Sequence, residues 1–382
     1  MTNSQTLFRG PLAGQRPRIV SGLGADPWLV LAVAALVGLG VVVVFNTSYF
    51  YGQRMFGDAL YIFRKHLLSI TIGAVLCLIA ARIPSERYRA LAYPLLLAVL
   101  VALVLVLIPH LGVVRGGARR WLHLGPLNLQ PSEAAKLAIV LYLAHSIARK
   151  GDKLRSFQGG VLPHCIVVGV LALLMLVEPD FGSAAIAGAL LVCMLFAGGV
   201  RVRHLAIPAL CALPLLIYEV MRSGYRMKRI LAFLNPGIDP QGIGYQLNQS
   251  FIAFGSGGVW GVGLGEGRQK LFYLPEAHTD FIFSVIGEEL GLAGALLVLT
   301  LFAIIAVRGF RIALRHTDTF ASLLAFGVTL ALVLQGVINM GVVLGCLPTK
   351  GLALPFLSYG GSAMIAALTQ TGVLLALARE TG

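Results

Sequence analysis

A carboxylate at the boundary between a polar loop and an apolar segment is the residue of this sequence best placed for chemistry. Asp280 lies in the stretch 274–283, where a long polar loop runs into a long apolar run. A carboxylate there reaches polar groups at a membrane surface without carrying its charge into hydrocarbon. We predict that Asp280 is a general base. The alternative is a helix N-cap, a role that Thr279 would also suit.

The residues around Asp280 extend this hypothesis. Glu276 and His278 are neighbouring candidates for acid–base work. The apolar run 280–307 predicts a helix of about 40 Å. Hydrocarbon is about 30 Å thick, so the Asp280 end would project into the headgroup region. Ser284 and Glu288 follow Asp280 on one helical face, and we expect that face to point into a bundle or a wet groove.

A second ionisable pair begins another apolar run. Glu133 and Lys136 are three residues apart and therefore share a helix face, where they can form an ion pair. One alternative is simple charge neutralisation near the membrane, and the other is contact with a substrate. Nearby, Arg119, Arg120 and Trp121 suit either an interfacial anchor or an anion contact.

Composition defines the elements that must hold these residues. The chain has 382 residues, 58% of them hydrophobic and 12% charged, whereas soluble proteins have about 25% charged residues. We predict an all-α polytopic membrane protein, because backbone in a bilayer must satisfy its own hydrogen bonds. About ten transmembrane helices are expected. They lie near 28–46, 66–82, 91–109, 133–148, 161–177, 184–200, 204–221, 280–307, 318–346 and 361–378.

Charge predicts the orientation. Residues 1–27 read as a flexible cytoplasmic tail, and 28–382 as one membrane domain with cytoplasmic N- and C-termini. An extracytoplasmic loop at about 222–279 then joins helices 7 and 8. Every long outer loop is basic, which indicates that this face handles an anion. The five cysteines have no metal-ligand spacing, and we expect no His/Cys metal cluster.

Several motifs together resemble one family. They are GARRW at 117–121, QPSEAAKL at 130–137, EPDFGS at 178–183, GYQ at 244–246, LPEAHTDFIF at 274–283 and PFLSYGGS at 355–362. Their order is similar to that in the SEDS family, which contains FtsW, RodA and SpoVE. Within it, the stretches 269–270, 273–280 and 348–352 look more like the division branch, FtsW, than like RodA.

The resemblance implies a peptidoglycan glycosyltransferase that polymerises lipid II outside the bacterial cytoplasmic membrane, in septal cell-wall synthesis. It also implies a class B penicillin-binding protein (FtsI-like) and other divisome proteins as partners, with no nucleic acid. Asp280 matches the family's catalytic aspartate. Candidate substrate contacts are Arg119, Arg120, Trp121, Glu133, Lys136, Gln249, Lys270, His278, Lys350 and Ser358. A lipid II flippase, a RodA-like elongation polymerase and a noncatalytic scaffold are the alternatives.

Resemblance and residues together predict a mechanism. Asp280 would take the proton of a sugar 4-hydroxyl while C1 is displaced from the lipid diphosphate, with inversion. The diphosphate needs charge stabilisation, either from side chains such as Arg119, Arg120, Lys136 and Lys270 or from a divalent cation, Mg²⁺ or Mn²⁺. The sequence leaves this choice open.

Overall fold

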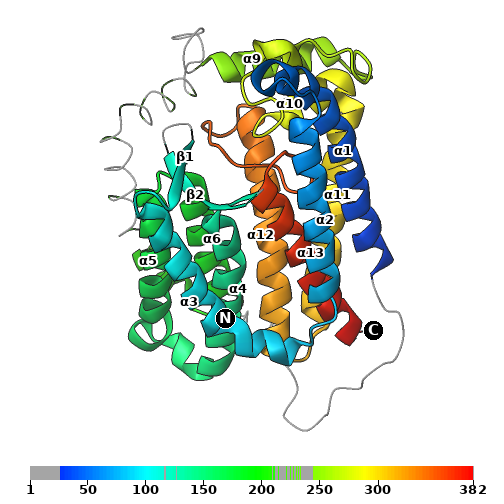
Figure 1. Ribbon diagram of the computed structural model, residues 1–382. Helices are drawn as coiled ribbons and strands as arrows, with labels where there is room; N and C mark the ends of the chain where they lie inside the picture. Colours follow the sequence, from blue (N-terminus) through cyan, green and yellow to red (C-terminus); the bar gives the residue numbers. More distant parts are fainter. Residues whose placement is uncertain are drawn as a thin grey trace.

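The computed structural model describes residues 26–115, 118–125, 127–208 and 244–381, with isolated positions from 210 to 233. The α-helices are α1 (Pro27–Phe56), α2 (Tyr61–Ala80), α3 (Ser85–Leu107), α4 (Pro131–Lys150), α5 (Leu162–Val177), α6 (Phe181–Ala197), α9 (Tyr245–Gly257), α10 (Ile282–Glu289), α11 (Gly291–Arg315), α12 (Thr319–Val343) and α13 (Gly361–Thr381). Short helical turns are η1 (Gly151–Arg155), η2 (Phe157–Val161) and η3 (Gln269–Tyr273). The helices form a bundle (Figure 1).

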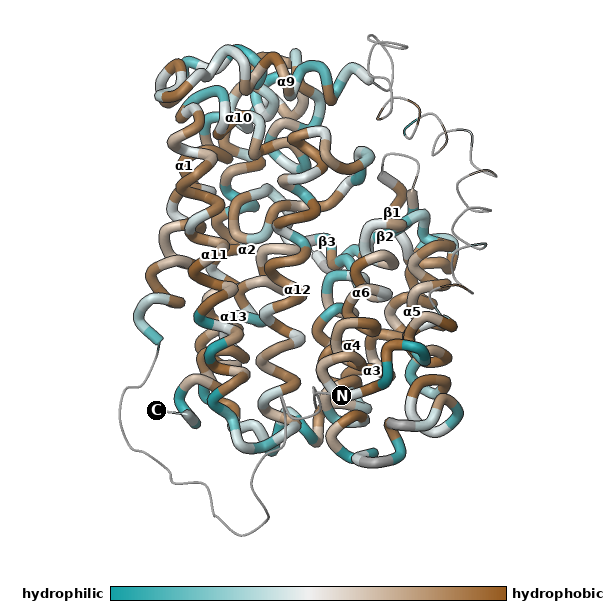
Figure 2. Tube along the Cα trace, turned by 180° about the vertical axis from the view of Figure 1, so that it is seen from behind, coloured by the Kyte–Doolittle hydropathy of each residue, from teal (hydrophilic) through white to brown (hydrophobic). Residues whose placement is uncertain are grey.

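The helices fit a membrane. In the described part of the chain, seven helical segments are long and apolar enough to span a bilayer. Apolar residues follow the helices, and hydrophilic residues gather at the ends of the bundle (Figure 2). The all-α polytopic prediction is confirmed. The expected span 204–221 lies mostly outside the described residues, as do residues 1–25 and much of the expected loop 222–279.

Ion pairs fix one end of the bundle. Asp26, which caps α1, lies 2.7 Å from Arg308 near the end of α11. Arg89 near the start of α3 lies 2.8 Å from Asp318, the cap of α12. Figure 1 shows that the start of α1 and the end of α13 both lie at this end of the bundle.

At the opposite end, α3 and α4 are joined by a small antiparallel sheet, an element that the sequence analysis missed. It contains β1 (Gly112–Arg115), β2 (Ala118–Leu124) and β3 (Leu127–Leu129), in the order β1-β2-β3. Gly112 pairs with Leu122, and Leu122 pairs with Leu129. A Cβ at Gly112 would lie 2.0 Å from the Val106 carbonyl, so only glycine lets the sheet lie this close to α3.

The expected single helix over 280–307 is wrong, because the structure breaks it between α10 and α11. Gly291 has φ +66°, and a Cβ there would lie 2.4 Å from the backbone nitrogen of Gly261. The glycine-rich loop after α9, residues 258–263, crosses the break and bonds to both helices. Val262 N donates to the Glu288 carbonyl, and Leu292 N donates to the Gly258 carbonyl. The loop thus satisfies helix-end groups that otherwise lack partners.

Candidate functional site

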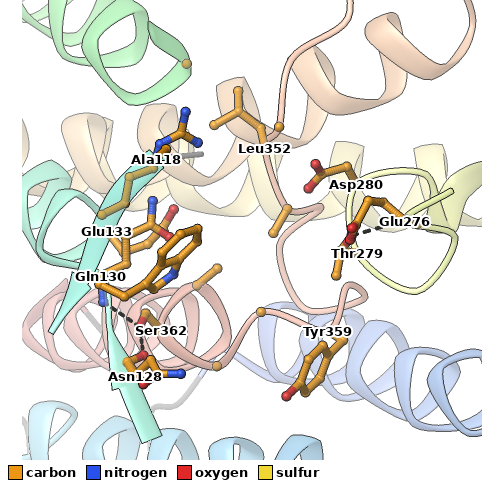
Figure 3. Close-up of a pocket in the computed structure, with 18 of the residues that line it drawn as sticks. Ala118, Asn128, Gln130, Glu133, Glu276, Thr279, Asp280, Leu352, Tyr359 and Ser362 are labelled. Carbon is orange, nitrogen blue, oxygen red and sulfur yellow. Dashed lines mark hydrogen bonds between the residues drawn. The ribbon is translucent and has the colours of Figure 1, made fainter. Parts of the chain in front are cut away.

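Six of the eleven predicted site residues line one cavity of about 840 Å³ at the end of the bundle that carries the sheet: Arg120, Trp121, Glu133, His278, Asp280 and Lys350. Its walls come from α1, α2, β2, the starts of α4, α6 and α13, and the loops before α10 and α13. In Figure 3, Glu276, Thr279 and Asp280 face Gln130 and Glu133 across the space. Segments far apart in sequence therefore build one site.

Asp280 lies in the turn immediately before α10 and lines the cavity. Phe281 is the N-cap of α10 and no side chain caps this helix, so the N-cap alternative for Asp280 is wrong. No described residue makes a hydrogen bond to the carboxylate of Asp280, although its backbone carbonyl is bonded to Asn339. The carboxylate is therefore available to a ligand.

The surroundings of Asp280 suit a base at neutral pH. Burial, followed by the negative charge of Glu276, raises the pKa of Asp280 to about 7, while Arg229 and Arg120 oppose the rise. A catalytic base is most effective when its pKa lies near the working pH. Ser284 and Glu288, predicted on the same stripe, do not line the cavity. They are buried inside the bundle, as expected for that face.

Three consecutive carbonyls fix the backbone that carries Asp280. The His278 carbonyl accepts from Tyr359 N at 2.9 Å. The Thr279 carbonyl accepts from Ser358 Oγ at 2.6 Å, and the Asp280 carbonyl accepts from Asn339 Nδ2 at 2.8 Å. The turn before α10 is thereby attached to α12 and to the loop before α13.

Glu133 and Lys136 form the predicted ion pair in the first turns of α4, with 2.7 Å between Nζ and the carboxylate. Both are buried, and Lys136 also donates to the side-chain oxygen of Gln335 on α12. Glu133 lines the cavity but Lys136 does not. The structure thus places Lys136 behind the wall, where its charge is already paired.

Neighbouring arginines of β2 differ in direction at a β-bulge, where Arg120 is the extra residue between the pairs Val113–Trp121 and Val114–Arg119. Arg120 lines the cavity, and its Nε donates to the Glu178 carbonyl at 3.0 Å while Nη2 donates to the Pro179 carbonyl. Arg119 instead donates to the Leu107 carbonyl at 3.3 Å and does not line the cavity. Of the two, only Arg120 is positioned for a ligand in the cavity.

Other cations complete the cavity wall. Lys350 Nζ lies 4.8 Å from the centre of the Phe181 ring, and burial lowers the pKa of Lys350. Arg229 donates to the Thr349 carbonyl at 3.0 Å. Lys65 on α2 lines the cavity too. Among the described residues, four cations from four separate parts of the chain therefore line a space that also holds Asp280, as an anionic ligand requires.

Aromatic rings form a further part of the wall. Tyr51 and His278 have ring centres 4.8 Å apart, and His278 and Tyr359 have ring centres 5.8 Å apart. All three line the cavity, as does Trp121 from β2. Burial lowers the pKa of His278. His278 is therefore favoured as a neutral ring at pH 7, so it is better suited to contact than to holding an anion by charge.

Three other predicted substrate contacts do not line the cavity. Lys270 is buried in η3 and pairs with Glu289 at 2.7 Å. Gln249 lies on α9. Ser358 is buried and bonds to the Thr279 carbonyl. Lys270 and Ser358 therefore support the loops around Asp280 in this structure.

The turn between α5 and α6 contributes more than the sequence indicated. Asp180 caps α6 and accepts from Ser132 Oγ at 2.7 Å and from Gln130 Nε2 at 3.1 Å. It lines the cavity and ties the starts of α4 and α6 together. Glu178 is fully buried, and burial, then Asp180, raises its pKa to about 8. The sequence gave no sign of this contact with α4.

The donor set can be compared with the predicted divalent cation. In the described ranges, no group of three or more His, Cys, Asp or Glu side chains could hold a metal ion. Asp280 and Glu276 are nevertheless hard oxygen donors on the cavity wall. Mg²⁺ commonly uses one or two carboxylates together with substrate phosphates and water. These residues fit an ion shared with a phosphorylated substrate.

Fold and site together define a polytopic membrane protein with a carboxylate- and cation-lined cavity at one end of its helical bundle. The chain belongs to the FtsW/RodA/SpoVE family, described as cell cycle proteins, whose family model matches residues 27–382.

Individual relatives agree with this assignment. A probable peptidoglycan glycosyltransferase FtsW of Trichlorobacter lovleyi is 47% identical over 92% of each chain. One of Coxiella burnetii is 41% identical over 93% of this chain and 96% of its own. A chain in a structure described as a peptidoglycan synthase complex that coordinates polymerization and crosslinking has a TM-score of 0.77 and 31% identity, over 94% of this chain and 99% of that one. The crystal structure of Thermus thermophilus RodA has a TM-score of 0.68 and 30% identity, over 94% of this chain and 97% of that one.

Proposed function

We propose that this protein is a peptidoglycan glycosyltransferase that polymerises lipid II into β-1,4 glycan strands on the outer face of the cytoplasmic membrane. The observation that carries this is a carboxylate without a hydrogen bond to any described side chain or backbone group, in a cavity that also holds four cations. A lipid-linked sugar diphosphate needs both features. The relatives described as FtsW support the same reaction and the division branch of the family.

The proposed reaction uses the two sides of the cavity. Asp280, as the carboxylate, accepts the proton of the acceptor sugar's 4-hydroxyl while that oxygen attacks C1 of the donor. The bond from C1 to the diphosphate oxygen breaks, and C1 is inverted from an α to a β linkage. Arg120, Arg229 and Lys350 lie on the wall where they can stabilise the departing negative charge.

A divalent cation is part of the proposal. When bound, Mg²⁺ or Mn²⁺ would neutralise charge on the diphosphate, and Asp280 and Glu276 would supply its protein oxygens. The cations on the wall would still orient the phosphates. Arg120 is favoured for this because two of its donors are held by backbone carbonyls, which fixes the plane of the guanidinium group.

We propose that the enzyme works at the division septum beside a class B penicillin-binding protein and other divisome proteins. Support comes from the relatives described as FtsW and from the likeness to a chain of a peptidoglycan synthase complex. This chain would then supply the polymerisation step, and its partner the crosslinking step.

The test is glycan synthesis by purified protein with lipid II in the presence of a β-lactam. We expect Asp280→Asn to reduce polymerisation about 100- to 10,000-fold, because Asn keeps the size but cannot accept the proton. Glu266→Gln is the matched control and should keep wild-type activity, because Glu266 is exposed and does not line the cavity.

Each outcome identifies a different function. Near-normal synthesis by folded Asp280→Asn protein would refute the assigned base. Translocation of the lipid II headgroup without polymer from the unmodified protein would favour the flippase alternative. Polymer that forms only when the penicillin-binding protein is added, and equally well with Asp280→Asn, would favour a scaffold.

A further inference from the structure

Asn339 on α12 lies directly behind Asp280 and is 1% exposed. Its Nδ2 donates to the Asp280 carbonyl at 2.8 Å and to the Leu352 carbonyl at 2.6 Å. The two N–H bonds of one amide thus connect the turn that carries Asp280 to the loop that carries Lys350. Both of those side chains line the cavity.

The orientation of this amide is determined by its partners. Both contacts are carbonyl oxygens, which only accept hydrogen bonds, so a reversed amide would set its own oxygen against them. Oδ1 of Asn339 is buried and has no partner in the described part of the chain. Both N–H groups of the amide are therefore hydrogen-bonded, while its oxygen is buried without a partner among the described residues, which costs free energy.

The next turn of α12 repeats the arrangement. Gln335 is four residues earlier and so lies on the same helix face. Its Nε2 donates to the Ala353 carbonyl at 2.9 Å, and its Oε1 accepts from Lys136, the partner of Glu133. One face of α12 thus connects the Glu133–Lys136 pair, the loop before α13 and the backbone of Asp280.

The loops need this support because they contain little regular structure. No helix or strand is formed between Leu344 and Gly360. Backbone carbonyls in buried, irregular segments must find side-chain partners. The carboxylate of Asp280 has no hydrogen bond of its own to a described residue, so its place depends on its backbone and on Gly351. A Cβ at Gly351 would lie 3.1 Å from Asp280 Oδ2.

We propose that Asn339 is a positioning residue for Asp280, and that the Gln335–Asn339 face of α12 fixes the separation of Asp280, Lys350 and Glu133 across the cavity. This rests on the proposed glycosyltransferase function and adds the residues that set its geometry. A displacement of about 1 Å in a reacting group lowers rate by about 100-fold. Loss of the amide should therefore act on turnover rather than on lipid II binding.

The experiment compares Asn339→Leu with Thr329→Val, each in the full-length protein. Thr329 is also buried on α12, but its Oγ donates at 2.7 Å only to the Ala325 carbonyl of its own helix. We expect Asn339→Leu to lower kcat by about 10- to 100-fold, with KM for lipid II within about threefold. The control should change neither of these.

Wild-type activity, Asp280→Asn and thermal unfolding are measured in the same series. Folded Asn339→Leu with wild-type kcat overturns the positioning role. If it does not fold, Asn339→Ser is used under the same criteria, because it is smaller and puts no apolar group against the carbonyls. Misfolding of both variants identifies a purely structural residue and also overturns the proposal. No polymer from the wild type, or an active Asp280→Asn, refutes the proposed function instead.

Discussion

At the scale of the residue, the site depends on one carboxylate kept partly neutral. Burial and Glu276 raise the pKa of Asp280 to about 7, compared with about 4 for an aspartate in an unfolded chain. Near neutral pH both the neutral and the base form of Asp280 are then populated. Arg120 and Arg229 limit the rise, so the same cations that suit the diphosphate also preserve the base.

We expect glycan synthesis to rise as pH increases through about 7 and to level off above it, because only the carboxylate accepts a proton. Glu276→Gln removes the negative charge beside Asp280 and should shift the rising part of the pH–rate profile to lower pH. The measurement is initial rate against pH at saturating lipid II. A limb that stays in place in Glu276→Gln would contradict the assigned cause.

The same pKa predicts a stability effect. Because the pKa of Asp280 is raised in the folded protein, its contribution to stability is complete below about pH 4 and is lost as pH rises through about 7. Asp280→Asn should therefore unfold at a higher temperature than wild type at pH 8, and the difference should shrink towards pH 5. Thermal unfolding in detergent at both pH values checks this. If Asp280→Asn and wild type differ in unfolding temperature by the same amount at pH 5 and at pH 8, ionisation of Asp280 is not responsible.

At the scale of the element, the break between α10 and α11 places Asp280. Every residue of the short helix α10 is buried, and the loop 258–263 bonds to helix ends on both sides of the break. Glu288 holds the next part of that loop by accepting from Arg268 N at 2.8 Å. Asp280 is thus presented by a short helix anchored inside the protein rather than by the end of a long membrane span.

Gly261→Ala should disrupt this junction. A Cβ at Gly261 would lie 2.1 Å from the Glu289 carbonyl, and φ there is +82°. Gly265→Ala is a matched control, since its φ is +85° but no atom lies within 4 Å of the added Cβ. Both variants should lose about 1–2 kcal/mol of folding stability because of the backbone conformation. Gly261→Ala should lose more stability than Gly265→Ala and should also lose activity. Equal unfolding temperatures for the two variants would contradict the clash.

At the scale of the whole molecule, the cavity exists because distant segments meet. Lys65 comes from α2, Arg120 from β2 and Lys350 from the loop before α13. The small sheet carries Arg120 over the bundle end, and the turn carbonyls at Glu178 and Pro179 hold it there. An anion would therefore meet cations from several elements at once.

Arg120→Lys should impair the enzyme although charge is kept, because lysine cannot make two fixed bonds to the turn and also face the ligand. We expect kcat/KM for lipid II to fall by about 10- to 100-fold, equivalent to about 1.5–3 kcal/mol. Arg119→Lys is the control, because Arg119 does not line the cavity. Rates against lipid II concentration decide the outcome. Equal losses in both variants would point to damage to β2 instead.

The sequence by itself determined the membrane class, the family and the importance of Asp280, because composition and ordered motifs are local properties of the chain. It also predicted the Glu133–Lys136 pair, since a spacing of three fixes a helix face. It did not predict the break at Gly291, because the loop that crosses it is about 30 residues earlier and only the folded chain brings the two together. Tertiary structure alone separated Arg120 from Arg119 and placed Lys270 away from the cavity. It also placed Asn339 behind Asp280, because such contacts depend on which distant backbone carbonyls come within hydrogen-bonding distance.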